Sequence, residues 1–122
     1  MSADLDVNKK FQKELNSGTA ALVLLSLLDR TPEPMYGYQI TKIMETHDGD
    51  IPMMKQGALY PVLRSLELAG LLQSHVDPSV SGPPRRYYRI TEEGQKTLAQ
   101  WADIWKKTKS FVDAFLKGER HD

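Results

Sequence analysis

The chain has 122 residues, of which 40% are hydrophobic and 26% charged, and this composition is typical of a single globular domain. Cysteine is absent, which excludes disulfides, thiolate metal sites and a cysteine nucleophile. Sixteen basic and sixteen acidic residues give a net charge of zero, which argues against a non-specific nucleic-acid binder.

No stretch of the sequence is long and apolar enough to cross a membrane. The longest apolar run, residues 20–25, is far shorter than the roughly 20 residues that a membrane-spanning helix needs. The N-terminal segment is polar and lacks the apolar region of a signal peptide. We therefore expect a cytoplasmic protein with no membrane partner.

The N-terminal part of the chain is expected to contain two helices. Phe11 and Leu15 indicate a short amphipathic helix in an arm of residues 1–18, and Gly18 is expected to interrupt it. Residues 19–29, "TAALVLLSLLD", are apolar on nearly all sides, which predicts a helix at the centre of the core. The prolines of "RTPEPM" then end this helix.

Two further helices are predicted before the chain changes to strands. Residues 36–47 form one of them, with Ile40, Ile43 and Met44 as its buried face. The other lies within "GALYPVLRSLELAGLL", where Leu59, Leu63 and Leu66 follow helical spacing and Gly70 is a suitable end. Pro61 costs nothing if it lies in the first turn, whereas it would kink a helix that begins several residues earlier.

A hairpin and a long helix complete the chain. Leu72, Ser74 and Val76 alternate with polar residues, and a similar alternation after "PSVSGPP" predicts a second strand, so the fold class is mainly α with a two-stranded β-hairpin. Thr91 is expected to cap the last helix, with Glu92 and Glu93 in its first turn.

The last helix carries an apolar seam with spacings of 3 and 4 residues, which is typical of a dimerisation helix. The seam consists of Leu98, Trp101, Trp105, Thr108, Val112 and Phe115. It could pack on its own domain. We favour packing against a second copy of itself, or against the N-terminal helix of a partner subunit, which predicts a homodimer.

Three helices followed by a hairpin is the element order of a winged helix-turn-helix, whose third helix enters the DNA major groove. Two segments contain bases and no acids. Residues 51–66 contain Lys55 and Arg64, and residues 78–91 contain Arg85, Arg86 and Arg89. A neutral protein with this distribution can still present a positive face to duplex DNA.

The motifs "MYGYQI", "GALYPVLRSLELAGLL" and "GPPRRYYRITEEG" resemble those of the PadR-like transcriptional regulators in order and spacing, over residues 17–94. The resemblance implies a DNA-binding domain over residues 19–91 and a dimerisation helix with its tail over residues 92–122, as in the small members of the family. It also implies that Tyr36, in the first motif, contacts DNA. Ala58 departs from the Thr or Ser common in the family, and this position is expected to add little affinity.

The third helix and the hairpin supply the other candidate DNA contacts. Gln56 can pair with adenine and Arg64 with guanine, while Lys55 suits a phosphate. The Tyr60 hydroxyl can donate to a phosphate, or its ring can pack against the hairpin. Arg85 and Arg86, next to a turn stiffened by two prolines, suit a phosphate or the minor groove.

Trp101 and Trp105 have two interpretations: core of the dimer interface, or walls of a slot for an aromatic or cationic ligand. Small members of the family use a tryptophan on this helix for the second purpose, and Trp105 lies at the matching distance. The three histidines are scattered, so we expect no metal site, no cofactor and no catalytic residue.

The sequence thus predicts a sequence-specific DNA-binding regulator, a dimeric repressor of a palindromic operator, with release by a small aromatic ligand as an option. The alternatives are a winged-helix module for protein–protein contacts without specific DNA binding, and a small-molecule carrier built around the tryptophans.

Overall fold

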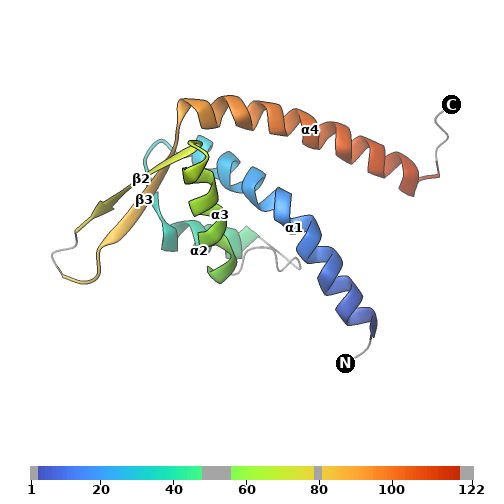
Figure 1. Ribbon diagram of the computed structural model, residues 1–122, viewed down its shortest axis with the longest axis horizontal. Coiled ribbons are helices and arrows are strands. Elements are labelled where there is room, and N and C mark those ends of the chain that lie inside the picture. Colours follow the sequence, from blue (N-terminus) through green and yellow to red (C-terminus); the bar gives the residue numbers. More distant parts are fainter. Residues whose placement is uncertain (1–2, 48–55, 79–80, 119–122) are drawn as a thin grey trace.

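The computed structural model describes residues 3–47, 56–78 and 81–118, which form four helices and three short strands. In chain order these are α1 (Ala3–Arg30), β1 (Met35–Tyr36), α2 (Gly37–His47), α3 (Gln56–Leu68), β2 (Leu72–Asp77), β3 (Arg85–Ile90) and α4 (Glu92–Leu116). This order confirms the winged helix-turn-helix with a long C-terminal helix. Figure 1 shows the wing, β2 and β3, extending from one side of the helices, with the start of α1 and the end of α4 on the opposite side.

α1 is one continuous helix of 28 residues, so the expected interruption at Gly18 is wrong. A glycine inside a helix costs about 1 kcal/mol relative to alanine, which is too little to end a helix whose neighbours favour that conformation. The C-terminal half of α1 is also held by packing, because Leu24, Leu25 and Leu28 are buried. They form the centre of the core.

α3 buries the stripe that its spacing predicts. Leu59 and Leu63 are fully buried and Leu66 is nearly so, and all three pack against α1 and α2. Burying a leucine contributes about 1.5–3 kcal/mol relative to leaving it exposed, so this stripe determines which face of α3 points outward. The helix ends as expected before Gly70, whose φ of 81° is unfavourable for other residues.

Pro61 lies inside α3 and not in its first turn. It is the sixth residue counted from Gln56, so its missing N–H would otherwise have donated to the Gly57 carbonyl. Of the two alternatives, the one in which Pro61 lies in the first turn and costs no hydrogen bond is therefore wrong. The helix tolerates it because the buried leucines hold both sides of this position.

The sheet has three strands in the order β1-β3-β2, one more than the expected hairpin. β1 pairs with β3 through Met35 opposite Tyr88 and Tyr36 opposite Tyr87, and α2 accordingly begins at Gly37, one residue later than predicted. In the wing, Leu72 lies opposite Ile90 and Asp77 opposite Arg85. The sheet therefore joins the start of α2 to the wing.

A tight junction connects the end of α3 to the start of α4. Thr91 caps α4, as predicted, and its hydroxyl accepts a hydrogen bond from the Gly94 N–H at 2.9 Å. The same hydroxyl donates to the Gly70 carbonyl at 2.8 Å, and the Thr91 N–H donates to the Leu71 carbonyl at 3.1 Å. A Cβ on Gly94 would lie 2.2 Å from the Leu71 carbonyl oxygen, so this junction admits only glycine without a shift of the backbone.

Candidate nucleic-acid interface

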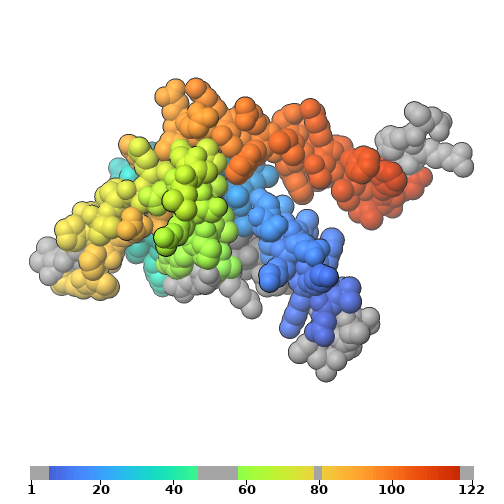
Figure 2. Space-filling view, viewed as in Figure 1, coloured from blue at the N-terminus to red at the C-terminus, as the bar shows by residue number. Residues whose placement is uncertain are grey.

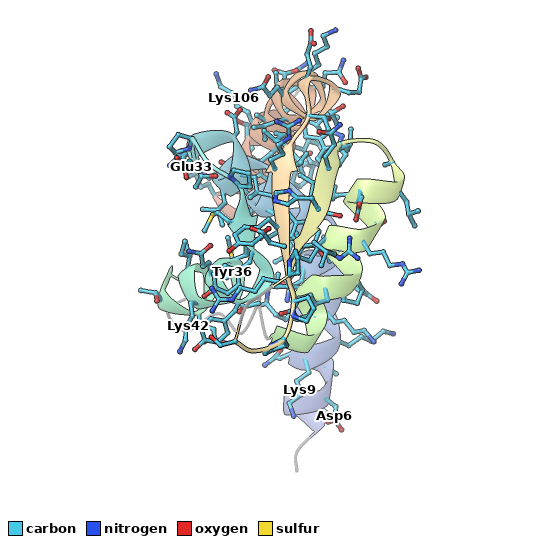
Figure 3. All side chains as sticks on the ribbon, turned by 90° about the vertical axis from the view of Figure 1, so that its left-hand side faces the viewer. Asp6, Lys9, Glu33, Tyr36, Lys42 and Lys106 are labelled. Atoms are coloured by element: carbon cyan, nitrogen blue, oxygen red, sulfur yellow. The ribbon has the colours of Figure 1, made fainter. Side chains whose placement is uncertain are left out.

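The candidate interface is formed by α3, the start of α2 and the wing. Tyr60 and Arg64 are exposed and lie four residues apart, so they share an exposed face of α3 to one side of its buried leucines. Viewed from the wing side, β2 and β3 lie between α2 and α3, and Tyr36 lies between the strands and α2 (Figure 3). Side chains from three separate segments can therefore act on one ligand.

Tyr60 of α3 packs closely over the first residue of α2. A Cβ on Gly37 would lie 2.7 Å from Tyr60 Cε1 and 3.1 Å from its hydroxyl oxygen. Glycine at this position therefore lets the aromatic ring approach the N-terminal end of α2. The Tyr60 side chain is still 41% exposed, so its packing leaves part of the ring accessible.

Four of the predicted DNA contacts line one hollow of about 330 Å³ between α2, α3 and the wing. They are Tyr36, Tyr60, Arg85 and Arg86. Pro83 and Pro84 form the wing side of the hollow. Arg64 does not line it and lies further along α3. Lys55 lies outside the described residues, as does the side chain of Gln56, the first residue of α3.

Arg85 lies on the outer face of the sheet and is held there by aromatic rings. Its guanidinium carbon is 4.6 Å from the centroid of the Tyr36 ring, a cation–π distance. The Tyr36 ring packs against Tyr87 at 5.6 Å, and the Tyr87 ring stacks on His75 at 5.4 Å. The strand alternation already places Arg85 and Tyr87 on one face. The role of Tyr87 and His75 as supports was missed because it also depends on β1.

Arg86 points to the inner face of the wing and is linked to α3. Its Nη1 donates to Ser74 Oγ at 2.9 Å, and that hydroxyl donates to Glu67 Oε2 of α3 at 2.5 Å. Next to them, burial raises the pKa of the Tyr88 phenol, with the positive charge of Arg86 opposing this effect and the negative charge of Glu67 adding to it. Neither Ser74 nor Glu67 was predicted to belong to the site.

The positive face contains acidic residues, although the two segments that supply its bases contain none. Glu67 reaches the inner face of the wing through Ser74, and Asp77 lies opposite Arg85 in the sheet. Both acids belong to residues 67–77, between the two segments, and the hairpin brings them next to the wing arginines. The charge pattern along the chain therefore indicates the bases of this surface but misses Glu67, which is linked to Arg86 through Ser74, and Asp77, which lies opposite Arg85.

Arg89 differs from the other two wing arginines. It lies toward the α4 end of β3, and its Nε and Nη2 donate to Gln73 Oε1 at 3.0 and 2.7 Å. Arg85 and Arg86 lie at the other end of β3, next to the loop. Only these two arginines line the hollow beside Tyr60.

The predicted seam of α4 divides into a covered part and an exposed part. Leu98 and Trp101 pack against the core, whereas Trp105, Val112 and Phe115 are 41%, 46% and 64% exposed. Thr108 is also exposed. Figure 2 shows the C-terminal half of α4 and the N-terminal half of α1 diverging from each other, away from the rest of the molecule.

A groove of about 660 Å³ lies where α1 and α4 diverge, and Trp101, Trp105 and Thr108 line it together with Leu15 and Gly18. A second groove, of about 470 Å³, lies between α1, α2 and α4 and also contains Trp105. Of the two predicted ligand-binding residues, Trp105 lines both of these grooves, whereas Trp101 lines only the first. Within the described part of the chain there is no group of residues suited to a metal ion and no helix that could span a membrane.

Comparison with known proteins identifies relatives of this architecture. The model of the transcriptional regulator PadR-like family matches residues 24–100. A crystal structure of a PadR family transcriptional regulator from Eggerthella lenta is 37% identical, covering 93% of this chain and 96% of that one, with a TM-score of 0.78. A transcriptional regulator from Clostridium thermocellum is 30% identical, covering 84% and 97%, with a TM-score of 0.74.

A structure of Bacillus subtilis PadR in complex with operator DNA is also similar in fold, with a TM-score of 0.61. It is 23% identical to this chain and the similarity covers 69% of this chain and 47% of that one.

Proposed function

Because the chain belongs to the PadR-like family of transcriptional regulators, we propose that it represses transcription as a homodimer bound to a palindromic DNA operator. Membership of the family makes it a DNA-binding winged-helix regulator and not an enzyme. The observation that carries the proposal is the single hollow that Tyr36, Tyr60, Arg85 and Arg86 share. A dimer seated on an operator represses by blocking access to the promoter, and it acts in the cytoplasm with the DNA.

In this proposal α3 is the recognition helix and enters the major groove. Arg64 pairs with guanine and Gln56 with adenine in this arrangement, each pair discriminating by about 1–3 kcal/mol. Lys55 and the Tyr60 hydroxyl contact phosphates at the N-terminal end of α3, where the helix dipole also favours an anion. Arg85 and Arg86 extend the contact to the neighbouring backbone or minor groove. A PadR of similar fold has been solved in complex with operator DNA, which supports DNA binding by this fold.

The homodimer is proposed from the exposed apolar residues of α1 and α4. On α4 they include Trp105, Val112 and Phe115, and on α1 Val7 and Phe11 are each 64% exposed. Exposed large apolar side chains that gather on particular helices in this way are typical of interaction sites. A two-fold axis would place two recognition helices on one face of the DNA, with half-sites about 10 bp apart or a multiple of that spacing.

We also propose that the groove around Trp105 accepts a small planar aromatic or cationic ligand. Its volume of about 660 Å³ lies within the range of about 300–1,000 Å³ that is usual for ligand pockets. A ligand that binds one arrangement of the dimer more tightly would shift the population toward it and release the DNA. Titration of planar drugs and phenolic acids against tryptophan fluorescence tests this, and absence of quenching by all of them would favour a plain interface core.

Fluorescence anisotropy tests DNA binding, with a duplex from the region upstream of the chain's own gene and a scrambled duplex at several salt concentrations. We expect a preference of at least about a hundredfold for the upstream duplex, because specific binding usually exceeds non-specific binding by more than that. Weak, equal binding to both duplexes would favour the protein–protein module. Tight ligand binding without DNA binding would favour the carrier.

The wing arginines provide the sharper version of this test. Each lost phosphate contact lowers the slope of log K against log salt by about 0.9, so the double variant Arg85→Ala/Arg86→Ala should lose nearly two units of slope. Arg89→Ala is the control, because it removes one positive charge from the same strand outside the hollow, and its slope should not change. An unchanged slope in the double variant would refute the assignment of both arginines.

A further inference from the structure

We propose that Ser74 is a positioning residue for DNA binding, which holds Arg86 of the wing in a fixed place beside the recognition helix α3. Ser74 does this as the middle member of a hydrogen-bonded chain that runs from Glu67 on α3 to Arg86 on β3. The inference rests on the proposed function, because its readout is the contact of Arg86 with DNA.

The hydroxyl of Ser74 is used in both of its hydrogen-bonding roles. It donates to Glu67 Oε2 at 2.5 Å and accepts from Arg86 Nη1 at 2.9 Å. A serine hydroxyl has one hydrogen and two lone pairs, so donation to the carboxylate leaves its lone pairs for the guanidinium. Hydrogen bonds to charged groups are shorter and about twice as strong as neutral ones. Ser74 is half-buried, which limits competition from water.

The sheet register brings these groups together. Ser74 lies opposite Tyr88 and Arg86 lies opposite Val76, so Ser74 and Arg86 are diagonal neighbours on the face of the wing that packs toward α3. Glu67, near the end of α3, faces them across the Ser74 hydroxyl. The chain thus connects the wing to the very helix whose other end is proposed to read the operator.

The benefit of this chain for binding is preorganisation. A free arginine side chain carries about 2 kcal/mol of rotamer entropy, which is lost when it is fixed on a phosphate. Arg86 has already lost part of this freedom before DNA arrives, so less is lost on binding. The neighbouring Arg85 is held by a different device, the Tyr36 ring on the opposite face of the sheet. The two wing arginines are therefore positioned independently.

The opposite reading, in which Ser74 and Glu67 withhold Arg86 from DNA, predicts an effect of opposite sign. If the chain positions Arg86, its loss weakens DNA binding. If the chain withholds Arg86, its loss strengthens binding, because the guanidinium becomes free. A measurement of the dissociation constant separates the two.

The experiment compares Ser74→Thr with Ser74→Val, which have the same shape and the same preference for strands and differ only in the hydroxyl. The full-length dimer is titrated with the upstream duplex, and Ser110→Ala on α4 is the control for an exposed serine elsewhere. We expect Ser74→Val to raise Kd about tenfold, or about 1.4 kcal/mol, with an unchanged salt slope because Arg86 still makes its contact once the DNA is bound. Ser74→Thr and Ser110→Ala should bind as the unmodified chain does.

A double-mutant cycle with Arg86→Ala distinguishes positioning from a general structural role. In the Arg86→Ala background, Ser74→Val should cause no further loss, because the side chain that Ser74 positions is gone. An equal loss in both backgrounds, no loss in either, or tighter binding by Ser74→Val would each overturn the proposal. Failure of the unmodified chain to bind the duplex would instead refute the proposed function, a result visible before any variant is made.

Discussion

The substitution Gly94→Ala should destabilise the protein, although alanine is normally the better helix residue. Gly94 lies in the first turn of α4, where a new Cβ would lie 2.2 Å from the Leu71 carbonyl oxygen and 2.7 Å from Ile90 Cγ1. The carbonyl cannot move away easily, because it belongs to the backbone and accepts the hydrogen bond of the Thr91 N–H. Either α4 or the turn before it must shift.

The expected magnitude follows from two opposing terms. Alanine gains about 1 kcal/mol over glycine in a helix, whereas overpacking costs about 1–3 kcal/mol and more where backbone must move. Since the closest contact is with backbone, we expect a net loss of about 2 kcal/mol in the free energy of unfolding. For a chain of this size that corresponds to a fall in Tm of roughly 6–10 °C.

Thermal unfolding followed by circular dichroism, at one protein concentration, measures this change. The concentration is fixed because Tm would depend on it if the chain dimerises as proposed. Gly18→Ala is the matched control, because a Cβ on Gly18 meets no described atom within 4 Å apart from its chain neighbours and the adjacent backbone of α1, and it should raise stability by up to about 1 kcal/mol. If Gly94→Ala is as stable as the unmodified chain, the close packing of this junction is refuted.

Three further predictions follow from other contacts. Thr91→Ala should lower the free energy of unfolding by about 1–2 kcal/mol, through loss of the α4 cap, and Thr91→Ser should restore most of it in urea titrations. Gly37→Ala should displace the exposed Tyr60 ring and raise the Kd for the upstream duplex. It should change the free energy of unfolding by under about 1 kcal/mol. An unchanged Kd would show that Tyr60 does not belong to the interface. The hydrogen bond from Lys109 holds the pKa of the Asp113 carboxyl below its usual value. Lys109→Ala should therefore raise this pKa toward the usual value, which an NMR titration measures. Because this pKa is lowered in the folded state, the stabilisation by the pair is present above the ordinary carboxyl pKa and is lost as the pH falls through the lowered one.

The elements with a regular hydrophobic period could be predicted from the sequence. The stripe of α3, the alternation of the wing and the cap of α4 at Thr91 are local signals, and the structure confirms them. β1 could not be predicted in this way, because Met35 and Tyr36 form a strand only by pairing with Tyr88 and Tyr87, some fifty residues later. The continuity of α1 was missed because a single glycine was given more weight than its cost justifies.

The candidate interface divides in the same way. The bases and aromatic residues of α3 and the wing could be selected by residue type and spacing, and four of them share one hollow. The residues that hold them in place could not be predicted in this way. The chain from Glu67 through Ser74 to Arg86 depends on the sheet register and on which face of the wing meets α3, and neither is encoded in a short motif.

The junction at Thr91 has a mechanical consequence for a two-fold assembly. Hydrogen bonds from Thr91 to Gly70 and Leu71, and the lack of room at Gly94, leave the end of α3 and the start of α4 without a free hinge between them. In the proposed homodimer, a tilt of α4 against its counterpart in the second subunit would therefore turn α3 by a similar angle. Such a rigid junction would convert the crossing angle of the two C-terminal helices into the separation of the two α3 helices, and so into the operator spacing that the proposed dimer fits.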